Sequence, residues 1–146
     1  MAPLPEDQYG AYHKNAKFWF TYQTPNIASI AAAGSTTNSI TFDNDSAFEW
    51  TKITVTADIA GAVQTQSSLV LVLGTVQIQD TGQGAYYSNA AIALAAYQGQ
   101  LGLPYVMPAP QIIAPNATLQ FNWNNYSAAT TYANLRLQLH GWKIRR

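Results

Sequence analysis

Apolar and polar residues alternate along the last part of the chain, over 132–144 (YANLRLQLHGWKI). The three leucines of this stretch fall on one face and polar residues fall on the other, which is the period-two pattern of a half-buried β-strand. After Gly141 the alternation changes phase, so Trp142 and Ile144 become the apolar positions and a β-bulge is predicted at the glycine. Residues 117–123 (ATLQFNW) alternate in the same way, and we expect the two segments to form neighbouring antiparallel strands.

The same pattern predicts four strands earlier in the chain, at 17–24, 38–42, 48–60 and 69–79. In the third of these the apolar phase changes near Thr51 and Lys52, which indicates a second bulge or a strand shared between two sheets. Beyond this change the inward positions run from Ile53 to Ile59. The first half of the fourth strand is apolar on both faces, so we expect it to be central, whereas its second half alternates.

Residues 80–115 show no clear alternation. The segment DTGQG, at 80–84, is typical of a turn, and four prolines from Pro104 to Pro115 interrupt the remainder. The alanine-rich segment 89–98 is compatible with a helical turn or with a short strand. Because loops this long are uncommon inside a domain, we expect a functional or contact loop here.

Six or seven strands without a long helix predict an all-β fold. We favour an antiparallel β-sandwich with long loops, and jelly-roll connections are among the options. Residues 1–15 hold two early prolines and a polar run, which indicates an extended N-terminal arm, followed by a single β-sandwich domain over 16–146. Tyr9 and Tyr12 favour an arm that docks on a neighbouring subunit over ordinary terminal disorder.

Charge is unusually scarce in this chain. Only 10% of the residues are charged, against about 25% in a typical protein, and Asp80 is the only charged residue between Ile59 and Leu135. The cores of protein–protein interfaces show such a depletion, although the same region also supplies core residues. The net charge is zero, so we expect no nucleic-acid-binding face, and we interpret the basic end from Lys143 onward as solvated.

Cysteine is absent, which excludes disulfides and leans toward assembly in a reducing cytoplasm. The N-terminus has no apolar signal region, and the longest apolar run, 69–73, is far too short to cross a membrane. We therefore expect no membrane partner.

Catalytic and metal-binding signatures are weak. Asp43, Asp45 and Glu49 are spaced unlike a calcium loop and are better explained as a turn between strands. His13 and His140, the two histidines, have no nearby carboxylate pattern, and we expect His140 on a sheet face at an interface. We expect no enzymatic activity, no cofactor and no metal.

Tyrosines gather in the predicted loops. Such side chains can stack on sugars, as in a carbohydrate-binding module, or can pack between subunits. We expect the second use, with burial between subunits of the surfaces that carry Tyr86, Tyr87, Tyr97, Tyr105 and Met107.

Four segments together resemble a known group of proteins: FDNDSAFEW, VQIQDTGQG, LPYVMPAPQIIAPNATLQF and the closing LHGWKI. Over roughly residues 37–144 the chain resembles small β-sandwich virion proteins of tailed bacteriophages, of the capsid cement, decoration or minor capsid kind. The resemblance implies a structural role, in which oligomers, often homotrimers, sit on the virion surface and bridge subunits of the major capsid protein after assembly in the host cytoplasm. Related sandwiches in head fibres and tails imply the alternative, a carbohydrate-binding or receptor-binding module of a virion.

Overall fold

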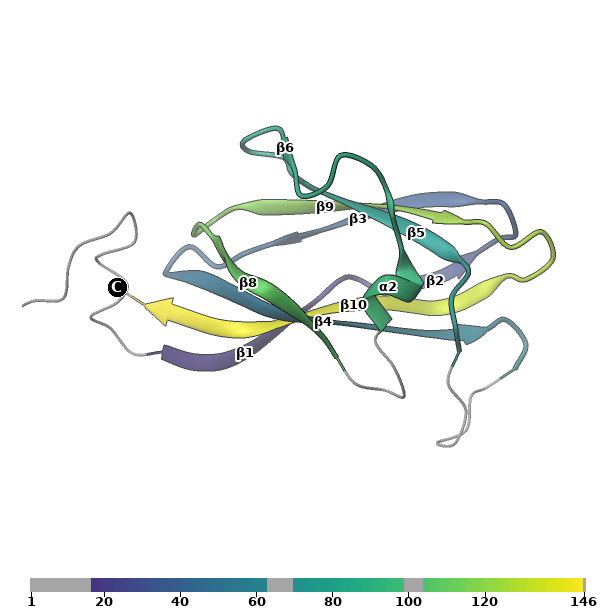
Figure 1. Ribbon diagram of the computed structural model, residues 1–146, viewed down its shortest axis with the longest axis horizontal. Helices are drawn as coiled ribbons and strands as arrows, with labels where there is room; N and C mark the ends of the chain where they lie inside the picture. Colours follow the sequence, from purple (N-terminus) through teal and green to yellow (C-terminus); the bar gives the residue numbers. More distant parts are fainter. Residues whose placement is uncertain (1–16, 63–69, 99–103, 146) are drawn as a thin grey trace, which may run out of the picture.

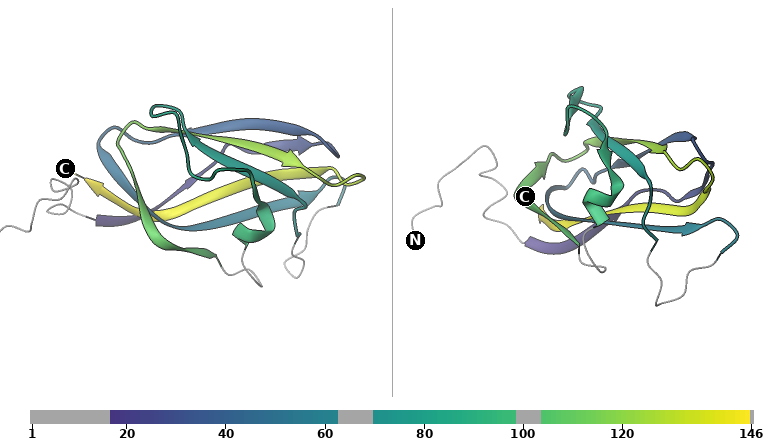
Figure 2. Two further views of the ribbon diagram at one scale, coloured as in Figure 1. Left: turned by 45° about the horizontal axis from the view of Figure 1, so that its top comes forward. Right: turned by 45° about the vertical axis from the view of Figure 1, so that its right-hand side comes forward.

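Two antiparallel sheets form the two layers of the computed structural model, which describes residues 17–62, 70–98 and 104–145 (Figures 1 and 2). Sheet A has the strand order β1, β10, β4, β8, and the short β2 also pairs with β10. Its strands are β1 Lys17–Gln23, β2 Ile27–Ile30, β4 Ser46–Ile59, β8 Tyr105–Ile113 and β10 Tyr132–Arg145. Sheet B has the order β3, β9, β5, β6, and the short β7 pairs with β5. Its strands are β3 Ser35–Thr41, β5 Gly74–Asp80, β6 Ala85–Tyr86, β7 Ile92–Ala93 and β9 Thr118–Asn125, and α2 spans Leu94–Gln98.

Without the short β2 and β7, the eight remaining strands pair like one long hairpin folded over on itself. The first strand pairs with the eighth, the second with the seventh, the third with the sixth and the fourth with the fifth. Pairing of β10 with β4 and of β9 with β5 then joins these hairpins into the two sheets. This is the strand order of a jelly roll. The predicted antiparallel β-sandwich is confirmed, and its connections are those of the jelly-roll option.

The core lies between the sheets and is built from the alternating apolar residues of both. The last two strands are not neighbours as predicted, because β9 lies in sheet B and β10 lies in sheet A. Their predicted inward faces are confirmed, because each of their core side chains is at most 1% exposed: Leu119, Phe121, Trp123, Leu135, Leu137 and Leu139. Trp50 joins them from β4. Each buried indole N–H has an acceptor, since Trp123 donates to Asn38 Oδ1 (2.8 Å) and Trp50 donates to the Lys52 carbonyl (3.0 Å).

The bulge predicted at Gly141 lies in the partner strand instead. Strand β10 pairs with β1 without interruption, whereas its register against β4 shifts between His140 and Gly141 and skips Thr51. The phase change predicted near Thr51 and Lys52 is therefore confirmed as a bulge within sheet A. At Gly141 the two strands come so close that a Cβ atom would lie 1.9 Å from the carbonyl oxygen of Glu49.

Because β10 keeps its phase, the residues after Gly141 are placed differently from the prediction. Trp142 is 37% exposed rather than inward, although Ile144 is buried as predicted. Lys143, predicted to be solvated, is buried. Its amine pairs with the carboxylate of Asp43 and lies 3.6 Å from the centre of the Phe20 ring.

Two further predictions about apolar positions are wrong. The segment predicted as a central strand from residue 69 becomes β5 only at Gly74, and Leu71 and Leu73 are more than half exposed. In the described part before β5, the Gln98 side chain binds the backbone of Val70 and Val72 in place of a neighbouring strand. Ile59, the last position predicted inward in β4, is 41% exposed.

The region 80–115 contains a strand that the prolines concealed. Strand β8 pairs with β4 on either side of Pro108 and Pro110, and its register jumps from Val106 to Gln111. Proline is tolerated here because β8 is an edge strand and the jump leaves residues 107–110 outside the ladder. The alanine-rich segment forms both of the predicted structures, the short β7 and one turn of helix in α2.

The predicted N-terminal arm, 1–15, lies outside the described residues, as does residue 16 at the start of the predicted domain. The rest of that domain forms one sandwich over the described ranges. None of the described helices has the length and apolar character needed to cross a membrane.

Candidate functional site

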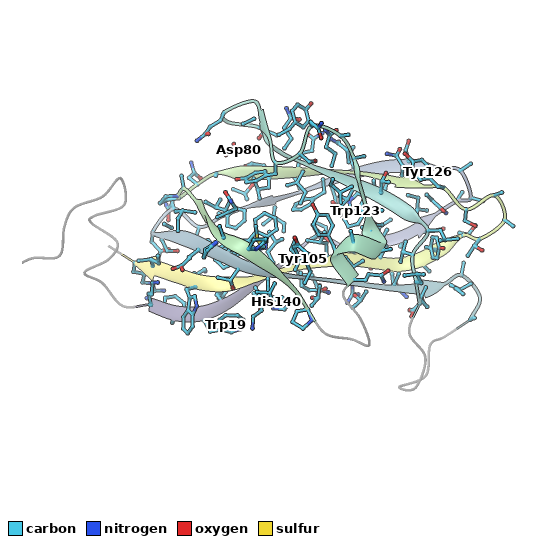
Figure 3. All side chains as sticks on the ribbon, in the orientation of Figure 1. Trp19, Asp80, Tyr105, Trp123, Tyr126 and His140 are labelled. Carbon is cyan, nitrogen blue, oxygen red and sulfur yellow. The ribbon has the colours of Figure 1, made fainter. Side chains whose placement is uncertain are left out.

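A groove opens between β8 and β6, the edge strands of the two sheets. Its larger hollow has a volume of about 450 Å³ and is mostly aromatic and apolar, with one amide: Trp50, Ile53, Ile78, Tyr86, Tyr87, Tyr97, Tyr105, Met107, Pro108 and Gln111. A second hollow of about 320 Å³ shares Tyr86, Tyr87 and Gln111 with the first and continues toward Asp80 and Gln83. We call the two together the tyrosine groove. Figure 3 shows Tyr105 between the two sheets.

Each wall of the groove is positioned by a different part of the fold. Strand β8 brings Tyr105 and Gln111 beside β4, where they pair with Ile53 and Trp50. Helix α2 contacts β4, β5 and β8 and carries Tyr97. The rings of Tyr97 and Tyr105 pack edge to face, with 5.6 Å between their centroids.

The opposite wall is the hairpin that carries β6. Asp80 Oδ1 accepts hydrogen bonds from the backbone N–H groups of Gly82 (2.9 Å) and Gln83 (3.2 Å), which fixes the turn between β5 and β6. The backbone N–H of Tyr87 donates to the Ile78 carbonyl, so the hairpin stays against β5. The Tyr87 ring then contacts the buried Trp50 edge to face, with 5.9 Å between ring centroids.

Among the described residues, the lining of the groove holds a single charged side chain. Its only ionisable carboxylate, Asp80, is 7% exposed and is held by the turn. Burial raises the pKa of the Tyr97 phenol, and the neighbouring Tyr105 adds to this rise. A mostly aromatic and apolar groove with a few polar groups has the composition of a ligand-binding site.

Five of the eight residues predicted as contact sites meet in this groove: Tyr86, Tyr87, Tyr97, Tyr105 and Met107. Their burial between subunits stays a prediction. Tyr9 and Tyr12 lie outside the described residues. Sequence reasoning missed Trp50 and Gln111 as lining residues, because their place depends on the register of β8, which the prolines obscured.

His140 lies elsewhere, on the outer face of sheet A, as Figure 3 shows. Its ring nitrogens contact the hydroxyls of Thr21 (2.9 Å) and Thr54 (2.8 Å), and its ring stacks against Trp19. Burial lowers the pKa of His140, and the positive charge of Lys52 lowers it further. His140 is on a sheet face as predicted, but its place at an interface stays a prediction.

The outer face of sheet B carries no charged side chain in its three longest strands. The residues that alternate with the core positions of β3, β9 and β5 are all uncharged and hydrogen-bonding: Ser35, Thr37, Ser39, Thr41, Thr75, Gln77, Gln79, Thr118, Gln120, Asn122 and Asn124. Local bonds such as Thr41 to Thr118 (3.0 Å) and Gln120 to Asn122 (2.8 Å) run across this face. The sequence showed that charge is scarce, but only the strand register shows that the uncharged polar residues share one surface.

The described acidic side chains are dispersed, and each has a partner. Asp43, Asp45 and Glu49 pair with Lys143, Arg145 and Lys17, respectively. Asp58 accepts a hydrogen bond from the Asn134 amide (2.9 Å). In the parts of the chain that the structure describes, no three histidine or acidic side chains gather in a way that could hold a metal ion.

Similarity to known proteins gives no further guide to the use of these surfaces. Comparisons with protein-family models, with curated proteins and with solved structures found no match for this chain.

Proposed function

We propose that this protein is a non-enzymatic capsid cement protein, which binds the major capsid protein lattice of a virion through the outer face of sheet B. The observation that carries the proposal is the absence of charge from that face, across three neighbouring strands. The jelly roll is a fold found in viral capsid proteins, although it also serves lectins, so the fold alone does not decide the function.

An uncharged hydrogen-bonding face suits repeated contacts with a lattice. Burial of a charged side chain needs a partner of opposite charge, whereas amides and hydroxyls can exchange water for hydrogen bonds of similar strength. The polar side chains of this face therefore present many donors and acceptors at a small cost of desolvation. Ordered water can bridge those that do not meet a partner directly.

The size of the face indicates weak individual contacts. With about 4.8 Å between strands and about 3.3 Å per residue, three strands of seven residues cover roughly 330 Å². A stable pair of proteins buries about 800 Å² on each side, so one such contact is not enough. A capsid supplies many equivalent sites, and an oligomer that engages several of them gains affinity through effective concentration.

An apolar patch extends this face at one end. Leu71, Leu73 and Tyr126 are each more than half exposed, and Leu73 and Tyr126 border a hollow that Thr75 of β5 also lines. Figure 3 places Tyr126 at the end of sheet B opposite Asp80. Exposed apolar side chains that gather in this way mark interaction surfaces more often than chance.

Cosedimentation with empty capsid shells of the virus that encodes the chain tests the proposal. We expect saturable binding of the wild type, and at least about a tenfold loss for Gln120→Lys, because this change buries an unpaired charge in the contact. Gln23→Lys is the matched control, since Gln23 is an exposed glutamine on β1 of sheet A. Absence of wild-type binding contradicts the cement role. Loss of binding in Gln23→Lys but not in Gln120→Lys would indicate that the capsid-binding surface lies on sheet A instead.

A further inference from the structure

We propose that the tyrosine groove is a binding site for a neutral sugar of about two rings. This inference goes beyond the capsid role and does not rest on it, because the groove opens between the sheet edges and not on the outer face of sheet B. It also gives the groove tyrosines a use different from the subunit contact expected from the sequence.

The near absence of charge in the groove limits the class of ligand that it can bind. No described lining side chain carries a charge except Asp80, whose carboxylate is buried and held by backbone N–H groups of its turn. An ionic ligand would leave its own charge unpaired in this site, whereas a neutral ligand would not. The complementary ligand is therefore uncharged.

The shape and polarity of the groove point to a sugar among the neutral ligands. Two adjoining hollows share Tyr86, Tyr87 and Gln111, so a ligand of two linked rings would place one ring in each. Aromatic rings such as Tyr105 offer flat apolar surfaces to the C–H face of a sugar. The Gln111 and Gln83 amides and the tyrosine hydroxyls offer donors and acceptors to its hydroxyl groups.

The edge strand disfavours the other extended ligand, a peptide that would add a strand to sheet A. Pro108 and Pro110 have no N–H group, and the register of β8 jumps from Val106 to Gln111 around them. A peptide could not form a continuous ladder along this edge. Recognition in the groove must therefore come from side chains, as it does for sugars.

Titration of the full chain with neutral monosaccharides and disaccharides, followed by NMR chemical shifts, tests the proposal. The probes are glucose, galactose, mannose, N-acetylglucosamine and disaccharides of these, with glucuronate as the charged comparison. We expect saturable binding of at least one monosaccharide with a Kd on the order of 1 mM, and at least about tenfold tighter binding of a matching disaccharide. Glucuronate should bind more weakly than glucose.

Two groove variants and one control locate the site. Tyr87→Ala and Gln111→Ala should each weaken binding about five- to tenfold, whereas Tyr126→Ala, at an exposed tyrosine outside the groove, should leave it unchanged. Gln111 is exposed, so its variant keeps the test valid even if Tyr87→Ala unfolds, which circular dichroism would reveal.

Three outcomes overturn the assignment. The first is that no neutral sugar binds. The second is that binding survives both groove substitutions. The third is that Tyr87→Ala abolishes self-association but leaves sugar binding intact, which would make the groove a contact between subunits. None of these outcomes bears on capsid cosedimentation, so the two proposals fail independently.

Discussion

Lys143 shows how much one side chain depends on its surroundings. In the sequence it belongs to a basic end that is predicted to be solvated, yet its amine lies among the rings of Phe20 and Tyr22 and pairs with Asp43. Burial opposes the charged amine, but hydrogen bonds with Asp43 and Tyr22 outweigh this effect, and the pKa of Lys143 is raised. No pattern of neighbouring residues could show this, because all three partners come from other segments of the chain.

The Asp43 to Lys143 pair predicts a dependence of stability on pH. The hydrogen bond from Lys143 holds the pKa of Asp43 below its ordinary value, despite an opposing effect of burial. A lowered folded-state pKa stabilises the fold above the unfolded value, near 3.9, and this contribution disappears as the pH falls through the folded value. We therefore expect Asp43→Asn to lower the free energy of unfolding at pH 7, and the difference from the wild type to shrink as the pH falls below about 5.

Urea unfolding at pH 7, 5 and 3 measures this effect. Asp45→Asn is the control, because the Asp45 to Arg145 pair is exposed and 3.5 Å long, and exposed pairs contribute little. A constant difference between Asp43→Asn and the wild type at all three pH values would contradict the prediction.

At the scale of the elements, alternation was a reliable guide where a strand has one face in the core and one in water. Strands β9 and β10 satisfy this condition, and their inward residues were predicted correctly through Leu139. Alternation did not predict the structure correctly where the backbone departs from a regular ladder between two strands. Strand β8 is hidden by its prolines, and the segment before β5 is held by Gln98 rather than by a strand.

The contact between β4 and β10 at the bulge gives a prediction for these two strands. Gly141→Ala would place a Cβ atom 1.9 Å from the Glu49 carbonyl oxygen, and backbone cannot move aside as a flexible side chain can. We expect a loss of about 1–3 kcal/mol in the free energy of unfolding, the range typical of overpacking. Gly82→Ala is the control, because its nearest contact, Asp80 Oδ1 at 3.4 Å, is an ordinary one. Chemical denaturation compares the three proteins, and equal stability of both variants would contradict the steric argument.

At the scale of the whole molecule, the jelly roll separates the charges from the uncharged polar residues. Apart from the buried Asp80, the charged residues in the strands belong to sheet A, while the outer face of sheet B is neutral. The same fold closes one side of the sandwich into the tyrosine groove, with residues from β4, β5, β6, α2 and β8. Neither arrangement belongs to any single element.

This distribution of charge predicts how the protein associates. We expect light scattering across a concentration series to give the mass of a homotrimer, as the resemblance to cement proteins implies. The mass should change little between 50 and 500 mM salt, because Asp43, Asp45 and Glu49 are already paired with cations within the chain and salt weakens only charge-mediated contacts. A monomer at every concentration would contradict the predicted trimer. Dissociation at high salt would instead place the charges of sheet A in the contact.

The sequence by itself determined the all-β class, most strands and the inward faces of β9 and β10, because each follows from the local period of two and from turn residues. It also revealed the scarcity of charge and the excess of tyrosine. Only the tertiary structure decided which strands are neighbours, that β10 has no bulge of its own at Gly141, and that the tyrosines of 86–105 share a groove with Trp50. The physical reason is that register and sheet order depend on contacts between residues far apart in the chain, such as Phe20 with Gly141 and Trp50 with Gln111, which no local pattern records.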